Sequence, residues 1–170
     1  IILVDSKGII YEGREGMDES KKKMALITNK QKIKGDLAAA MKGADIFIGV
    51  SRPNVLGEEM VRSMSRDPII FAMSNPDPEI SPFLAKKAGA KIIASGRSDY
   101  PNQINNVLAF PGLFRGVLDT RARFITDNMK LAAAKALAGL VKKPTARKII
   151  PGVFDKGVAA AIAKAVKKAL

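Results

Sequence analysis

The stretch FAMSNPDPE, residues 71–79, places a side-chain amide, Asn75, directly after an apolar run. Pro76 and Pro78 follow it. Each proline fixes its own φ near −65° and restricts the residue before it to extended conformations. Asn75 is therefore held in a narrow range of directions at the end of a predicted strand. A rigid amide in that position suits a ligand contact, and it also suits a simple cap of the strand end.

A second group of amides lies in NQINNVLAFPG, residues 102–112, just before a predicted apolar helix. Amides both donate and accept hydrogen bonds, so they can hold a carboxylate and a carboxamide without adding charge. Four amides within five positions exceed what the cap of one helix requires: Asn102, Gln103, Asn105 and Asn106. Such a cluster suits a site where a nicotinamide meets a small hydroxy acid.

Two further candidate residues follow apolar runs. Asp5 ends the run IILVDS, as an acid that binds the adenosine ribose ends the second strand of a dinucleotide-binding unit. On that interpretation the first strand and its Gly-rich turn are missing, and no G-x-G-x-x-G occurs in the 170 residues. Ser51, in IGVSRPN, follows small residues past which a cofactor backbone could pass.

Four short apolar runs would position these side chains, over residues 1–6, 44–51, 68–74 and 91–96. Helical patterns lie between them, over roughly 18–29, 35–43, 55–65 and 81–89. Continuously apolar strands that alternate with helices predict an α/β fold with a Rossmann-like, doubly wound and mostly parallel sheet that is buried on both faces. Ligands bind beyond the carboxyl ends of the strands in such a sheet.

The last part of the chain is predicted to be helical. Thr126 and Asp127 mark a helix start, and residues 156–170 carry an apolar stripe opposite lysines. We expect a helical segment over about 103–170 to pack on the sheet domain.

Composition narrows the chemistry. The chain has no cysteine and no histidine, so disulfides, thiolate nucleophiles and a histidine general base are excluded. No apolar run reaches membrane-spanning length, and we expect a cytoplasmic protein without a membrane partner. The net charge is +13, and +10 of it lies in residues 100–170. Such a charge could attract nucleic acid, but aromatic residues do not interleave with the basic ones as a stacking platform requires.

Five stretches resemble, in order along the chain, the NAD(P)-binding domain of bacterial malic enzymes. They are VDSKGIIYEGR (4–14), GVSRPNVLGEEMVRSM (49–64), FAMSNPDPEI (71–80), SDYPNQINNVLAFPGLFRGVLD (98–119) and IIPGVFDKGVA (149–159). The resemblance implies oxidation of L-malate with NAD or NADP, followed by decarboxylation of the bound product to pyruvate with Mg²⁺ or Mn²⁺. It also implies a homo-oligomer.

The resemblance further implies roles for individual residues. Two amides, Asn75 and Asn106, would contact malate. Six residues would bind the cofactor: Asp5, Ser6, Lys7, Ser51, Asn75 and Asn105. Of these, Asp5 and its neighbours would lie at the adenosine ribose.

The family's tyrosine acid, lysine base and carboxylate metal ligands come from segments before the second strand. Tyr11 and Tyr100 do not match that acid, and none of the lysines matches that base. We therefore expect no catalytic or metal-binding residue in this chain. It would be a C-terminal part of a malic enzyme, or one half of a split one, that needs the N-terminal domain as its partner and is inactive alone.

The dinucleotide preference depends on residues of opposite charge. Asp5 alone favours NAD, because it would repel a 2′-phosphate. Ser6, Lys7 and the lysine run 21–23 favour NADP, and we expect NADP with NAD tolerated. Two other functions remain open: another dinucleotide-dependent dehydrogenase, such as an amino-acid dehydrogenase, and a basic nucleic-acid-binding module on the same fold.

Overall fold

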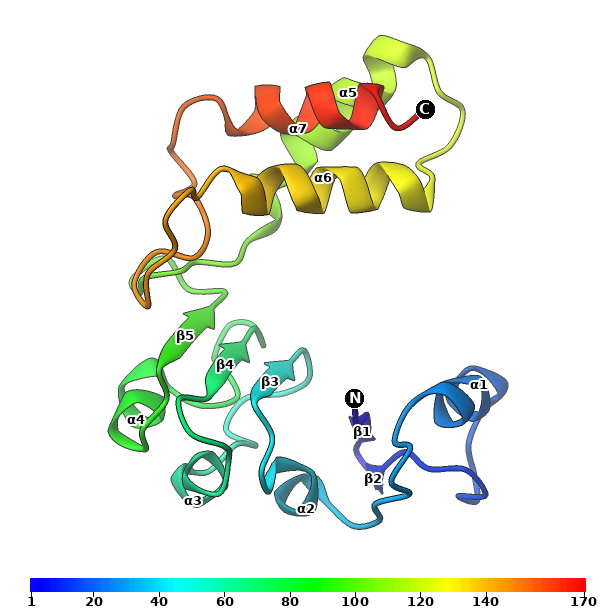
Figure 1. Cartoon of the computed structure of the whole chain (residues 1–170), viewed down its shortest axis with the longest axis vertical. Coiled ribbons are helices and arrows are strands. Elements are labelled where there is room, and N and C mark those ends of the chain that lie inside the picture. Colours follow the sequence, from blue (N-terminus) through cyan, green and yellow to red (C-terminus); the bar gives the residue numbers. More distant parts are fainter.

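In the computed structural model, which describes all 170 residues, three short strands form one parallel sheet. They are β3 (Ile46–Gly49), β4 (Ile69–Ala72) and β5 (Ile92–Ser95), in the order β3-β4-β5. Their arrows in Figure 1 point the same way, toward the helices of the C-terminal segment. The predicted α/β fold with parallel strands is confirmed, and the carboxyl ends of the strands face the helical segment.

Helices cover one face of this sheet. The helices are α2 (Leu37–Met41), α3 (Glu58–Arg62) and α4 (Pro82–Lys87). They share a core with the strands, built mainly from Met41, Val61, Ile70, Ala72 and Ala85. On the other face Ile46 and Ile48 of β3 are 52% and 63% exposed. The sequence predicted that both faces of the sheet are buried. In these 170 residues only the face that the helices cover is buried.

The first apolar run does not join this sheet. β1 (Val4–Asp5) turns back and pairs antiparallel with β2 (Gly8–Ile9) in a separate two-stranded sheet. Gly8 has a φ of +109°, which a glycine adopts without strain. The Ile9 N–H donates to the Gly35 carbonyl at 2.8 Å rather than to a parallel strand. The prediction of a parallel strand over residues 1–6 is therefore wrong for the chain described here.

Helix α1 (Glu19–Ile27) completes this N-terminal unit. The Asp18 carboxylate caps it by accepting the Lys21 N–H at 2.8 Å. Ala25 of the helix packs with Ile10 and Met17 in a small core of its own. The unit therefore holds together by contacts separate from those of the sheet.

The C-terminal segment forms a bundle with its own core. It contains the 3₁₀ helix η1 (Asn106–Leu108) and helices α5 (Phe110–Thr120), α6 (Asp127–Gly139) and α7 (Val158–Lys167). Helices α5 and α7 pack closely because Gly116 has no side chain. A Cβ at this position would lie 2.7 Å from the Val166 Cβ. Thr126 caps α6 as predicted, and its hydroxyl accepts the Met129 N–H at 3.2 Å. No helix in the chain combines the length and apolarity needed to span a membrane.

Asn102 connects this bundle to the sheet. Its buried amide donates to the Ile93 carbonyl of β5 at 3.0 Å and to the Ala146 carbonyl at 2.9 Å. Its amide oxygen accepts the Ile149 N–H at 2.9 Å. In Figure 1 the loop between α6 and α7 reaches down to the segment that leaves β5. Asn102 therefore joins residues that are more than forty positions apart.

Candidate functional site

Two predicted ligand residues lie at the carboxyl edge of neighbouring strands. Ser51 follows β3 and Asn75 follows β4, and both residues are exposed. The strands are paired up to Gly49 and Ala72, and the Met73 N–H donates to the Gly49 carbonyl at 3.1 Å. The structure thus brings the Ser51 loop and the Asn75 loop to one edge of the sheet.

The Asn75 loop is held by bonds to its neighbours. The Ser74 hydroxyl donates to the Asp77 carbonyl at 2.8 Å, and the Ser74 N–H donates to the Glu79 carboxylate at 3.0 Å. The Asn75–Pro76 peptide bond is cis. The Asn75 amide itself makes no hydrogen bond within the chain, so its donor and acceptor are free for a ligand.

The segment after β5 meets the same edge. The Ile104 N–H donates to the Ser95 carbonyl at 2.8 Å, which extends the pairing beyond the strand. The Arg97 guanidinium lies 3.5 Å from the Asp77 carboxylate, and it also pairs with Asp99 at 2.8 Å. Arg97 therefore links the loop after β5 to the loop after β4.

The four amides of residues 102–106 divide into different roles. Asn102 is the buried connection described above, and Gln103 donates a long bond of 3.4 Å to the Gly96 carbonyl. The Asn105 side chain caps η1 by accepting the Val107 N–H at 3.0 Å. Asn106 is exposed and its side chain makes no hydrogen bond in the chain. Of the four, Asn106 is the amide that remains open to a ligand.

The Asp5 carboxylate is already fully engaged. Its Oδ1 accepts the Lys7 N–H and an Arg14 N–H, each at 2.9 Å. Its Oδ2 lies 2.6 Å from the Arg14 Nη2 and 3.2 Å from the Lys21 Nζ. The bond from Arg14 holds the pKa of the Asp5 carboxyl well below its usual range. Four contacts use the acceptor positions of a carboxylate, so a ribose hydroxyl would have to replace one of them.

The β1–β2 hairpin and the loop before α2 line a polar hollow of about 790 Å³. Ser6 and three basic residues, Lys7, Arg14 and Lys34, line it together with the acids Glu15 and Asp36. The Lys34 ammonium lies 4.8 Å from the centre of the Tyr11 ring. Two of the predicted cofactor residues, Ser6 and Lys7, therefore face a polar space of mixed charge. Its lysines are of the kind that binds phosphate groups.

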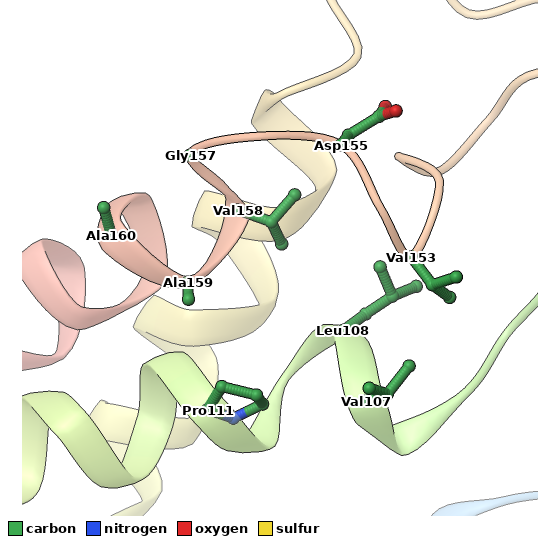
Figure 2. A pocket seen from close by; sticks show the side chains of 9 residues that line it. All are labelled: Val107, Leu108, Pro111, Val153, Asp155, Gly157, Val158, Ala159 and Ala160. Atoms are coloured by element: carbon green, nitrogen blue, oxygen red, sulfur yellow. The ribbon is translucent and has the colours of Figure 1, made fainter.

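A second cavity, of about 410 Å³, lies in the helical bundle and is mostly apolar. Figure 2 shows Val107, Leu108 and Pro111 on one side and the start of α7, with Val158, on the other. Asp155 at its rim is occupied, because it accepts the Gly152 N–H at 3.1 Å. In Figure 2 the Asp155 side chain points away from the cavity, and most of the residues that line the cavity are apolar.

Three residues hold the backbone at or near the site, and the sequence did not predict this structural role for them. They are Arg14, Glu79 and Asn102. Arg14 bonds to residues five to nine positions away, whereas Glu79 and Asn102 also bond to residues 28 and 44–47 positions away. The only local signal is for Glu79, an acid between a proline and the buried Ile80. No group of three or more acidic residues gathers as a metal site in these 170 residues. These residues alone do not fit a Mg²⁺ or Mn²⁺ site.

Comparisons with known proteins identify the family of this chain. The family model "Malic enzyme, NAD binding domain" matches residues 1–170. The bifunctional malic/malolactic enzyme of Bacillus subtilis is 55% identical over 172 residues, which cover 99% of this chain and 42% of that protein. The NADP-dependent malic enzyme of Escherichia coli is 45% identical over 99% of this chain and 24% of its own length.

A solved structure agrees as well. The NAD-dependent malic enzyme of Thermotoga maritima superposes with a TM-score of 0.92 and 48% identity, over 98% of this chain and 44% of that one. The chain thus spans less than half the length of these relatives, and its parallel sheet is that of a Rossmann-like dinucleotide-binding domain. On sequence and fold together, the chain belongs to the malic enzyme NAD-binding domain family.

Proposed function

We propose that the protein oxidises L-malate with NAD or NADP and decarboxylates the product to pyruvate, and that these 170 residues hold the dinucleotide and orient the substrate. One observation carries the proposal. Two open amides, Asn75 and Asn106, follow strands whose carboxyl ends face the same way in a chain of this family. Ligands of such sheets bind beyond those ends.

In this proposal the residues position the reactants and move no proton. Ser51 lies along the dinucleotide, and Asn75 contacts its nicotinamide side and the malate carboxylate. Asn106 contacts the malate carboxylate. The bound dinucleotide supplies the hydride acceptor. Orientation of reactants can lower a barrier by ~7–11 kcal/mol at the extreme. The capping bond of Asn105 supports a structural role for that residue beside its proposed contact with the cofactor.

We further propose that NADP is preferred and NAD tolerated. The charge of Asp5, which would repel a 2′-phosphate, is offset by Arg14 and Lys21. Ser6 and Lys7 line the adjacent polar hollow. Among the lysines 21–23, Lys21 alone reaches Asp5, while the Lys22 ammonium pairs with Glu19 at 2.8 Å. Both NAD- and NADP-dependent malic enzymes occur among the relatives.

The exposed sheet face supports a further part of the proposal. Ile46 and Ile48 of β3 are 52% and 63% exposed, and Val50, directly after the strand, is 77% exposed. Apolar patches of this kind mark contact surfaces. We propose that the remaining length of the enzyme, seen in the relatives, covers this face and supplies the acid, the base and the Mg²⁺ or Mn²⁺ ligands. Homo-oligomeric assembly and a cytoplasmic location belong to the same proposal.

The test is an assay of the full-length protein with L-malate, Mn²⁺ and either NADP⁺ or NAD⁺. We expect malate-dependent reduction of both cofactors, faster with NADP⁺ at low concentration, with pyruvate formed in equal amount. An amino-acid substrate serves as the comparison. Reduction with the amino acid but not with malate would exclude the proposed function and favour an amino-acid dehydrogenase.

A further inference from the structure

Glu79 is the one fully buried acidic residue in the chain, with 0% of its surface exposed. No lysine or arginine pairs with it. Its Oε1 accepts the Ser51 N–H at 2.9 Å, and its Oε2 accepts the Ser74 N–H at 3.0 Å. A buried carboxylate without a counterion is unfavourable unless its oxygens accept hydrogen bonds. These two backbone donors therefore offset the burial of Glu79.

The position of the carboxylate is set by the surrounding backbone. It lies where the strands β3 and β4 separate, just past the bond from Met73 to Gly49. A Cβ on Gly49 would come within 2.5 Å of the Glu79 Cδ, so only a glycine leaves room for it there. The main chain of Glu79 is also held in place, because the Leu56 N–H donates to the Glu79 carbonyl at 3.0 Å.

We propose that Glu79 is a positioning residue whose carboxylate fixes the Ser51 loop and the Asn75 loop relative to each other. One oxygen binds the backbone of Ser51 itself, and the other binds the residue directly before Asn75. Movement of either loop leaves a buried oxygen without a donor, so the two loops keep their relative position together. Buried polar groups that are fully satisfied give such rigidity.

The consequence for activity rests on the function proposed above. In that proposal Ser51 lies along the dinucleotide, and Asn75 contacts both the nicotinamide side of the dinucleotide and malate. A residue that sets the distance between those loops affects cofactor and substrate together, although it touches neither. Sites whose supporting contacts are lost become loose and inefficient.

The experiment measures hydrogen–deuterium exchange in the full-length protein and in Glu79→Gln, which keeps one acceptor and replaces the other by a donor. We expect exchange of the Ser51 and Ser74 amides to accelerate about tenfold or more, in both loops alike. The Leu56 amide should stay protected, because its acceptor is the main-chain carbonyl. Glu59→Gln is the matched control, since the Glu59 side chain is 89% exposed and lies in α3.

A second variant guards against a failure to fold. Gly49→Ala keeps the Glu79 side chain but displaces its carboxyl group, so it should accelerate exchange in the same two loops. If Glu79→Gln does not fold, Gly49→Ala decides the matter. Unchanged exchange in both loops, or acceleration in only one of them, would overturn the proposal.

Kinetics provide the readout that a purely structural role would not produce. In folded Glu79→Gln, well below its unfolding temperature, kcat/KM should fall about 10-fold or more for malate and for the dinucleotide alike. Normal values for both substrates in a variant with faster exchange would contradict the positioning role. If the wild-type protein does not oxidise malate, the proposed function fails, while the exchange data still decide whether Glu79 couples the loops.

Discussion

Arg14 and Asp5 form a two-pronged ion pair across the N-terminal hairpin, with contacts of 2.9 Å and 2.6 Å between guanidinium and carboxylate. The Arg14 side chain is 9% exposed, and it also donates to the Gly8 and Ile9 carbonyls. The pair therefore ties β1, β2 and the following loop together. The residue predicted to bind the ribose, Asp5, is thus a carboxylate whose charge is compensated by Arg14.

Asp5→Asn should destabilise the protein by about 3 kcal/mol at pH 7, because it leaves the buried Arg14 charge without its counterion. The measurement is urea unfolding followed by circular dichroism. The pKa of Asp5 is lowered on folding, so the stabilisation is present above the unfolded-state pKa of about 3.9 and is lost as the pH falls below it. The difference between wild type and variant should therefore shrink below about pH 4. Asp67→Asn, an exposed position, is the control. Equal stability of wild type and Asp5→Asn at pH 7 would contradict the interpretation.

Lys21→Gln should lower the ratio of kcat/KM for NADP to that for NAD about fivefold, because it removes a cation that offsets the charge of Asp5. Lys23→Gln serves as the control, since Lys23 is exposed and forms no ion pair. Lys22→Gln should have a smaller effect than Lys21→Gln, because Glu19 already holds the Lys22 ammonium. The assay is steady-state kinetics of the full-length protein with each cofactor. An unchanged ratio in all three variants would leave the NADP preference without a physical basis.

Asn106→Ala should lower kcat/KM for malate about 10- to 200-fold, which corresponds to the ~1.5–3 kcal/mol of a hydrogen bond to a charged group. The KM for the cofactor should move less. Asn105→Ala is the matched comparison, because its capping bond to Val107 contributes about 1 kcal/mol to stability. Equal shifts of the malate and cofactor parameters in Asn106→Ala would identify Asn106 as structural.

Asn102→Gly should lower the free energy of unfolding by about 2–4 kcal/mol, since the three hydrogen bonds of the buried Asn102 side chain are lost. Glycine is chosen because Asn102 has a φ of +58°, which glycine adopts without strain. Asn54→Gly is a matched control with the same φ of 58° on an exposed residue. Chemical unfolding of both variants gives the comparison, and similar losses in the two would argue against a connecting role for Asn102.

The 170-residue polypeptide on its own should not form NADPH from malate, because the tyrosine acid and lysine base that the resemblance implies have no match in it and no metal-binding side chains cluster in it. The full-length protein under the same conditions is the positive control. The measurement is absorbance of the reduced cofactor with malate and Mn²⁺. Sustained malate-dependent turnover by the 170 residues would show that the acid and base lie within them.

Local pattern was enough to predict the three parallel strands, the helices between them and the Thr126 cap. Each depends on neighbours a few positions away: continuous apolar runs form buried strands, and a hydroxyl before a helix satisfies a free N–H. The position of Asn75 just after a strand followed from the apolar run before it in the same way. The sequence also identified the family, because five motifs that resemble it occur in the same order along the chain.

Only the tertiary structure decided which polar residues are free and which are already bonded. Asn102 and Asn106 have the same side chain four positions apart, yet one is buried with Ile93, Ala146 and Ile149 while the other is open. The β1–β2 hairpin likewise depends on Gly35, and the Glu79 contact depends on Ser51, 28 residues away. A hydrogen bond between distant residues leaves no local pattern, because its partners come together only when the elements that carry them pack.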